Sequence, residues 1–183
     1  MCGICGVISQ ELALPQLEAV ARMNSAMIHR GPDGEGKFRD SHIAMAMRRL
    51  SIIDLDGGWQ PLYNETRDLV LVANGEIYNF IELREELRVR GHRFHTASDC
   101  ETILHLYEDH GEDCVQYLRG MFAFALWDSR RGCLFIARDR MGEKPLYIFE
   151  TSNELFYASE MKALLASGFV PNDLDPEAID LFF

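Results

Sequence analysis

The sequence predicts an α+β fold built from packed layers of sheet and helix. Strand-like segments follow one another in runs, and so do helical segments, whereas a parallel βαβ array would alternate the two. With 183 residues, of which 48% are hydrophobic, the chain is long enough to bury a sizeable apolar core. These observations exclude an intrinsically disordered chain.

The N-terminal part of the chain contains strand, helix and loop signals in turn. Residues 3–8 are apolar and predict a buried strand that begins almost at the first residue. Pro15 suits the first turn of a following helix, whose apolar positions recur at steps of three and four: Leu17, Val20, Met23 and Met27. A loop is predicted over 29–36. Two further strands are predicted, separated by the turn-forming residues 54–58, and they span 43–47 and 69–73.

Two helices are predicted in the middle of the chain. The first starts near Asn79 and ends before Gly91, and its apolar face is formed by Phe80, Leu83 and Leu87. The second opens with Ser98 and Glu101, whose spacing of three is that of a capping box, and it ends at Gly111.

Strands dominate the remainder, over 121–127, 133–137, 146–149 and 155–158. A helix start follows at 175–177, with Asp175 as N-cap, Pro176 at the first position and Glu177 in the first turn. The sequence stops inside this helix, which is too short to be stable alone. We therefore expect a chain cut just inside a following domain.

The charge balance disfavours two classes of partner. The chain has 18 Lys and Arg against 29 Asp and Glu, a net charge of −11, so a nucleic acid or an anionic membrane would be repelled. No apolar run approaches the roughly 18 residues of a membrane span, and no signal peptide is evident. Five cysteines, an odd number in a chain of this size, indicate reduced thiols rather than a disulfide framework. We expect a cytoplasmic protein.

Cys2 is the first candidate for chemistry. A small residue after the initiator Met permits removal of that Met, which leaves a cysteine with a free α-amino group. A thiol of pKa about 8.5 and an α-amine of pKa about 7.7–8.0 exchange a proton at a cost of about 0.7–1.1 kcal/mol, so one residue can supply nucleophile and base. The competing interpretation is an ordinary thiol in an apolar strand.

Other candidates are weak when each is taken alone. The amide of Asn74 and the N–H of Gly75 would suit an oxyanion hole, although Asn-Gly after a strand also predicts a hairpin turn. Arg49 could bind a carboxylate, and Glu76 and Asp99 could hold an ammonium. Each of these charges could instead be an ordinary surface group.

Metal and nucleotide sites have little support in the sequence. Cys2 and Cys5 form a Cys-x-x-Cys pair, but structural zinc takes four ligands and the other cysteines lie singly and far apart. His92 and His95 form at most a half-site, so we expect no metal ligand. Neither phosphate-binding glycine motif, G-x-x-x-x-G-K-[ST] or G-x-G-x-x-G, is present, and there is no G-x-S-x-G nucleophile elbow.

Ordered motifs extend along essentially the whole chain: the Cys2 start, Arg30-Gly31-Pro32-Asp33, the 49–54 segment, Gln60-Pro61-Leu62, the 74–79 segment, 98–101, 119–125, 138–147 and 159–164. Taken together, they resemble one family, the glutaminase domain of glutamine-hydrolysing asparagine synthetases. Two small departures are Trp59 and Glu143, which lie outside the proposed catalytic set.

The resemblance implies an N-terminal-nucleophile (Ntn) hydrolase fold, a four-layer αββα sandwich of two antiparallel sheets flanked by helices. It implies that Cys2 attacks the side-chain amide of glutamine, that Asn74 and Gly75 stabilise the oxyanion, and that a thioester forms as ammonia leaves. By the same resemblance, the substrate-binding residues are Arg49, Leu50, Ser51, Ile52, Ile53, Asn74, Gly75, Glu76 and Asp99.

The resemblance also implies two units and a set of partners. Residues 1–170 would form the glutaminase domain, and 171–183 a linker and first helix of a synthetase domain that receives the ammonia. This domain needs no cofactor of its own, ATP and Mg²⁺ would serve the synthetase domain, and a homodimer is compatible with the family. The alternatives are a relative that amidates another carboxylate, a glutaminase serving a sugar-phosphate acceptor, and a catalytically silent interaction module with the same fold.

Overall fold

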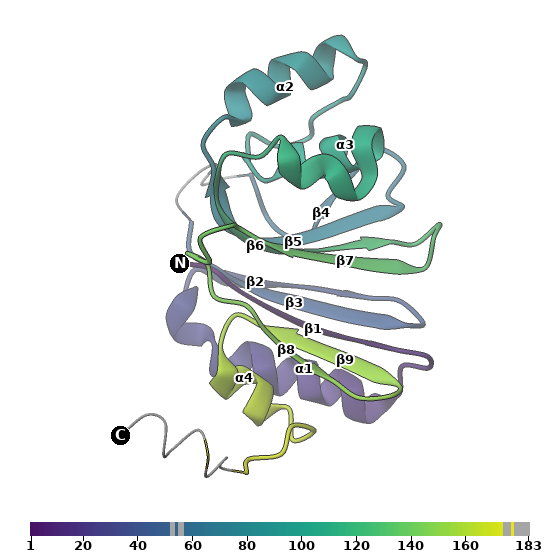
Figure 1. Cartoon of the computed structure of the whole chain (residues 1–183), viewed down its shortest axis with the longest axis vertical. Coiled ribbons are helices and arrows are strands. Elements are labelled where there is room, and N and C mark those ends of the chain that lie inside the picture. Colours follow the sequence, from purple (N-terminus) through teal and green to yellow (C-terminus); the bar gives the residue numbers. More distant parts are fainter. Residues whose placement is uncertain (52–53, 55–56, 174–176, 178–183) are drawn as a thin grey trace.

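The computed structural model describes residues 1–51, 54, 57–173 and 177. Two antiparallel sheets lie face to face, and helices cover the outer face of each, so that four layers follow one another (Figure 1). The four-layer αββα sandwich expected from the sequence is therefore confirmed.

The first sheet has the strand order β2-β3-β1-β9-β8. Helices α1 (Leu14–Ala26) and α4 (Met161–Ala166) pack on its outer face (Figure 1). Its strands are β1 (Gly3–Ser9), β2 (Gly34–Arg39), β3 (Ile43–Arg49), β8 (Tyr147–Glu150) and β9 (Glu154–Ala158).

The second sheet has the order β4-β5-β6-β7. Its outer face is covered by α3 (Glu101–His110), and α2 (Phe80–Val89) lies beyond α3 and packs against it (Figure 1). Short 3₁₀ helices follow α1 at Ile28–Arg30 and α3 at Gly111–Gln116. Its strands are β4 (Leu62–Tyr63), β5 (Leu69–Ile77), β6 (Gly120–Asp128) and β7 (Cys133–Arg138).

The central strands are buried on both faces, which explains their nearly continuous apolar sequences. In β1, Ile4 belongs to the core between the sheets, whereas Cys5 and Val7 face the helices. In β5, Val70 and Val72 face the other sheet, and the alternate positions from Leu69 onward face α2 and α3. Because side chains alternate along a strand, residue parity decides which layer each side chain enters.

The Asn-Gly pair at 74–75 does not form a hairpin turn. β5 continues through both residues, which pair with Ala123 and Phe122 of β6. The strand predicted over 69–73 therefore extends to Ile77. Pairing with β6 keeps the turn-forming dipeptide Asn74-Gly75 inside the strand.

The capping box predicted at Ser98 and Glu101 is wrong. The residue before α3 is Cys100, which makes no side-chain cap. Glu101 instead accepts hydrogen bonds from the backbone N–H groups of His95 (2.6 Å) and Thr96 (2.8 Å), so it holds the loop before the helix. The spacing of Ser98 and Glu101 fits a capping box, but the Glu101 carboxylate bonds to backbone N–H groups of the preceding loop instead.

Among the described strands and α-helices, three were not predicted: β2, β4 and α4. The first half of β2 falls within the predicted loop at 29–36, because glycine and charged residues conceal its alternation. Gly36 is required there, since a Cβ would lie 1.8 Å from the Gln60 carbonyl oxygen. The helix predicted from 175 lies outside the described residues except for Glu177. Among the helices that the structure does describe, none is long and apolar enough to cross a bilayer.

Candidate active site

Strand parity brings the candidate residues to one end of the space between the sheets. Asn74 and Glu76 have the parity of Val70 and Val72 in β5, and Arg49 has that of Met45 and Met47 in β3; all four apolar residues belong to the core between the sheets. Cys2 lies directly ahead of β1 with the parity of Ile4, which belongs to the same core. The N-terminus accordingly lies at one end of the space between the two sheets (Figure 1). A cleft there is lined by Cys2, Arg49, Asn74, Gly75, Glu76 and Asp99.

The Cys2 thiol is half-buried and in contact with the end of β3. Its Sγ lies 3.4 Å from the backbone nitrogen of Leu50 and 3.5 Å from the Leu50 carbonyl oxygen. Arg30 donates from Nε to the Cys2 carbonyl oxygen at 2.9 Å, and its Nη1 lies 3.1 Å from Glu160. The backbone at the nucleophile candidate is thereby fixed by a guanidinium that is itself held by a carboxylate.

The side-chain amide of Asn74 is an unused hydrogen-bond donor. Asn74 is 1% exposed, and its Nδ2 has no hydrogen-bond partner among the described residues. Buried polar groups are nearly always paired, so a buried, unpaired donor in a cleft is placed to receive an acceptor from a ligand. The preceding residue, Ala73, is fixed by the Gln60 side chain, which bonds its N–H (2.6 Å) and its carbonyl (3.1 Å).

Gly75 is packed against β6 without room for a side chain. A Cβ at this position would lie 2.3 Å from the Met121 carbonyl oxygen and 2.7 Å from the Phe122 Cα. Both are backbone atoms of a paired strand and cannot move aside. Glycine is therefore needed where the chain passes the cleft.

Charged groups of both signs line the same cleft. Arg49 is buried, donates to the Gly57 carbonyl at 2.9 Å and stacks on Trp59, with 4.5 Å from its guanidinium carbon to the ring centroid. Asp99 is buried and accepts a 2.7 Å hydrogen bond from the N–H of Ile77, which ties the segment before α3 to the end of β5. Glu76 lies nearby on β5.

Three predicted binding residues do not form part of the described cleft wall. Ser51 donates its backbone N–H to Asp33 at 2.7 Å and lies outside the lining. Ile52 and Ile53 lie outside the described residues. Leu50 does line the cleft, through the contacts with Cys2 given above.

The cleft also contains residues that the sequence did not single out. Lys144 is 4% exposed, and its Nζ lies 2.9 Å from the sulfur of Met1, whose side chain occupies the same cleft. Asp139 fixes the turn that carries Lys144: it accepts from the backbone N–H groups of Glu143 (2.9 Å) and Lys144 (3.0 Å). Burial opposes ionisation of Asp139, but these hydrogen bonds outweigh it and lower its pKa. The burial of Lys144 cannot be read from the sequence, so the available sequence signal for this residue was the run of charged residues in its turn.

The five cysteines are free thiols, as predicted. Burial raises the pKa of the Cys5 and Cys100 thiols, so both stay protonated at neutral pH. Burial likewise raises the pKa of Cys114 to about 12. These three thiols are therefore poor nucleophiles, whereas Cys2 opens onto the cleft.

The arrangement suits an amino acid with an amide side chain. A guanidinium and two carboxylates can pair with the carboxylate and ammonium of a zwitterion, while a thiol and an unpaired amide donor remain for a carbonyl group. Within the described residues of the cleft, a free thiol and an unpaired amide donor thus lie beside charges of both signs.

Comparison with known proteins points to the same chemistry. A family described as glutamine amidotransferase domain matches residues 1–183. The chain is 42% identical over 187 residues to asparagine synthetase [glutamine-hydrolyzing] 1 of Bacillus subtilis, covering 100% of this chain and 29% of that protein. It is 44% identical over 167 residues to asparagine synthetase B of Escherichia coli, covering 90% of this chain and 30% of that protein. The chain thus spans about three-tenths of the length of these relatives.

Solved structures share the fold at lower identity. Glutamine phosphoribosylpyrophosphate amidotransferase from B. subtilis, complexed with ADP and GMP, superposes with a TM-score of 0.74 at 24% identity. The match covers 91% of this chain and 44% of that one. At this identity the likeness shows the fold alone.

Proposed function

Since the chain belongs to the glutamine amidotransferase domain family, we propose that it hydrolyses glutamine to glutamate and ammonia, with Cys2 as nucleophile. The observation that carries the proposal is the buried Asn74 Nδ2, which has no partner in the described part of the chain and lines one cleft with Cys2. A lone reactive thiol has many explanations. A thiol beside an unused, preorganised donor favours acyl transfer.

The proposed reaction begins with loss of Met1. With Met1 present, the nitrogen of Cys2 is an amide and the Met1 side chain forms part of the cleft lining; without Met1, the nitrogen is an amine that can accept the thiol proton. Sγ then attacks the side-chain carbonyl carbon of glutamine, and the Asn74 amide and the Gly75 N–H stabilise the oxyanion. The protonated amine returns its proton to the leaving nitrogen, ammonia departs, and water hydrolyses the glutamyl thioester.

The proposed substrate contacts follow the charges of the cleft. Arg49 binds the α-carboxylate of glutamine, and Glu76 and Asp99 bind its α-ammonium. Leu50 lies against the nucleophile and would contribute backbone groups. The assignments of Ser51, Ile52 and Ile53 rest on the family resemblance.

The relatives suggest the fate of the ammonia. We infer that this domain serves a synthetase domain in the manner of the glutamine-hydrolysing asparagine synthetases, with aspartate as acceptor. ATP and Mg²⁺ would be used by that second domain, because this sequence contains neither of the phosphate-binding glycine motifs considered above. A homodimer and a cytoplasmic location belong to the same proposal.

Glutaminase activity of the Met-free protein tests the mechanism. Intact mass first establishes that Met1 is absent, and glutamate release from glutamine is then measured. Cys2→Ala is expected to abolish release while thermal unfolding stays cooperative. Wild-type activity in Cys2→Ala would overturn the nucleophile assignment, and no activity in Met-free wild type would favour the silent interaction module.

A further inference from the structure

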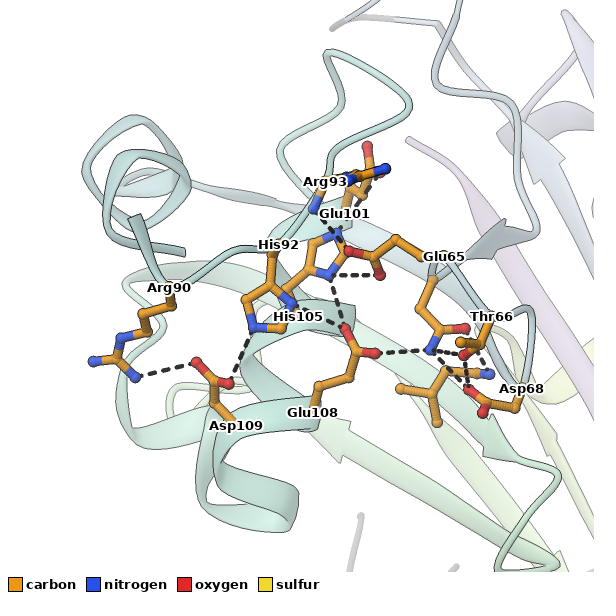
Figure 2. Close-up of polar contacts among 12 residues, drawn as sticks. Glu65, Thr66, Asp68, Arg90, His92, Arg93, Glu101, His105, Glu108 and Asp109 are labelled. Carbon is orange, nitrogen blue, oxygen red and sulfur yellow. Dashed lines mark hydrogen bonds and ion pairs between the residues drawn. The ribbon is translucent and has the colours of Figure 1, made fainter. Parts of the chain in front are cut away.

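A second cluster of chemically versatile side chains lies within the helical layer over β4 and β5, and none of its residues lines the cleft at Cys2. Glu65 comes from the turn after β4, His92 from the segment after α2, and His105 and Glu108 from α3. Figure 2 shows these four side chains pointing toward one another. One ligand-type atom from each lies within 4.8 Å of the other three.

The spacing of these atoms approaches that of a tetrahedral site. His105 Nδ1 lies 2.9 Å from Glu108 Oε2 and 3.6 Å from Glu65 Oε2, and His92 Nδ1 lies 3.3 Å from the same Glu108 oxygen. A zinc ion bound at about 2.0–2.1 Å by four tetrahedral ligands would hold them about 3.3 Å apart. Closure of the site therefore requires small rotations of side chains and no rearrangement of the backbone.

Each histidine directs its other ring nitrogen at a carboxylate. His92 Nε2 lies 3.0 Å from Asp109, and His105 Nε2 faces Glu101 at 3.9 Å (Figure 2). In metal sites, such an outer carboxylate fixes the tautomer and leaves the inner nitrogen free to bind the ion. The His92 ring is thus held in the orientation of a metal-ligating histidine, whereas His105 Nε2 faces Glu101 without a hydrogen-bond partner among the described residues.

The two carboxylate ligands are oriented in the same way. The second oxygen of Glu108 accepts from Asn64 Nδ2 at 2.8 Å, and the second oxygen of Glu65 accepts from the backbone N–H of Arg93 at 2.7 Å. All four inner atoms therefore belong to side chains whose outer atoms face a polar partner. In a solvated cluster of surface charges, the outer atoms of the side chains would not all be expected to face polar partners.

We propose that Glu65, His92, His105 and Glu108 form a binding site for a divalent transition-metal ion, with Zn²⁺ as the preferred occupant. Two carboxylates and two neutral imidazoles balance a dication, and a set of two nitrogens and two oxygens suits zinc better than Mg²⁺ or Ca²⁺, which prefer oxygen ligands and higher coordination. With four protein ligands the site has no open position, so its role is structural. It joins the turn after β4, the connection between α2 and α3, and α3 itself.

A proton is the natural competitor for this site. Burial opposes protonation of His105, but the neighbouring carboxylates, Glu101 at 3.9 Å and the hydrogen-bonded Glu108 at 2.9 Å, outweigh burial and raise the pKa of its imidazole to about 9. The carboxylates that hold the proton are among those that would surround the metal. Without a metal, the cluster would be a network of ion pairs around an imidazolium.

Metal titration of the whole chain distinguishes the two occupants. The purified protein is stripped with a chelator and titrated with Zn²⁺ against a chromophoric competitor, and Tm is followed in parallel. We expect one Zn²⁺ per chain, an increase in Tm and no competition from equimolar Mg²⁺. His92→Gln and Glu65→Gln should each weaken zinc binding by at least about tenfold. The matched control is His42→Gln. His42 hydrogen-bonds to the Gln10 carbonyl oxygen beside the other sheet, so this substitution should leave zinc affinity unchanged.

Co²⁺ provides a spectroscopic test that excludes the thiols as ligands. The intense visible bands of tetrahedral Co²⁺ should appear without a thiolate-to-cobalt charge-transfer band, and Cys2→Ser should leave them unchanged. A spectrum dominated by thiolate transitions, or stoichiometric zinc binding that persists in both His92→Gln and Glu65→Gln, would refute the site. No zinc uptake by protein with a native near-UV circular dichroism spectrum would assign the cluster to the proton-held network.

Discussion

Replacement of Asn74 by alanine is the most direct test of the proposed oxyanion site. The substitution removes Nδ2, a buried donor with no partner within the described structure, and leaves the β5 backbone in place. Loss of one preorganised oxyanion donor reduces kcat by about 100- to 1,000-fold, which corresponds to about 2.7–4 kcal/mol of transition-state stabilisation. KM for glutamine should change little, because the donor acts mainly on charge that develops after binding.

Stability should respond far less than catalysis. Removal of an unpaired buried donor relieves a desolvation cost of about 1–3 kcal/mol, which offsets the packing lost with the side chain. Glutamate release by Met-free Asn74→Ala is measured beside urea unfolding, with Asn153→Ala as the control because Asn153 is an exposed turn residue far from the cleft. A kcat within threefold of wild type in a stably folded Asn74→Ala protein would refute the assignment of Asn74.

Three further predictions concern the groups around Cys2. Gly75→Ala should destabilise the fold by about 1–3 kcal/mol in urea unfolding, because its Cβ would lie 2.3 Å from the Met121 carbonyl oxygen; unchanged stability would contradict the close β5–β6 approach. Arg49→Lys should raise KM for glutamine about tenfold with little effect on kcat, since lysine cannot reproduce both the hydrogen bond to the loop and the stacking; an unchanged KM would remove Arg49 from the binding set. Burial opposes ionisation of Glu160, but hydrogen bonds from His29, Arg30 and Lys162 outweigh it and lower its pKa to about 2. A lowered carboxyl pKa adds stability that is fully present above the unfolded value of about 4.3 and is lost as pH falls through the folded value. The difference in unfolding free energy between wild type and Glu160→Gln should therefore shrink between about pH 4.3 and 2, and a difference independent of pH would contradict this.

The two kinds of proposal can fail independently. The glutaminase proposal rests on the cleft at Cys2 and Asn74, whereas the metal proposal rests on the side chains around His105. Zinc binding without glutaminase activity would support the metal proposal alone, and glutaminase activity without zinc binding would support the glutaminase proposal alone.

Element types were largely predictable because they depend on local periodicity. The strands that became β1, β6, β7, β8 and β9 were placed within one or two residues, and the helix near Asn79 ends as expected before Gly91, whose φ of +106° suits glycine. β2 was missed because an edge strand with charged and glycine residues lacks that periodicity. The capping box failed because Glu101 found donors in the loop rather than at the helix start.

The candidate site shows the same division. Its residue types could be read from the chain, but Asn74 and Gly75 looked like a turn, and only pairing with β6 keeps them in a strand that directs Asn74 between the sheets. The expected absence of a metal site rested on the spacing of His92 and His95. The structure places His92 beside His105 instead, and His95 is not among the cluster's ligands.

The sequence by itself determined the α+β layering, the nucleophile candidate near the N-terminus and the chemical classes present, because composition and local periodicity are properties of neighbouring residues. The tertiary structure decided which of these groups meet. Contacts such as Cys2 with Leu50, or Glu65 with His105, join residues that are far apart along the chain, and they arise from sheet register and helix packing, which local patterns do not encode. The functional content of this chain therefore lies in long-range pairings between residues whose local signals were ordinary.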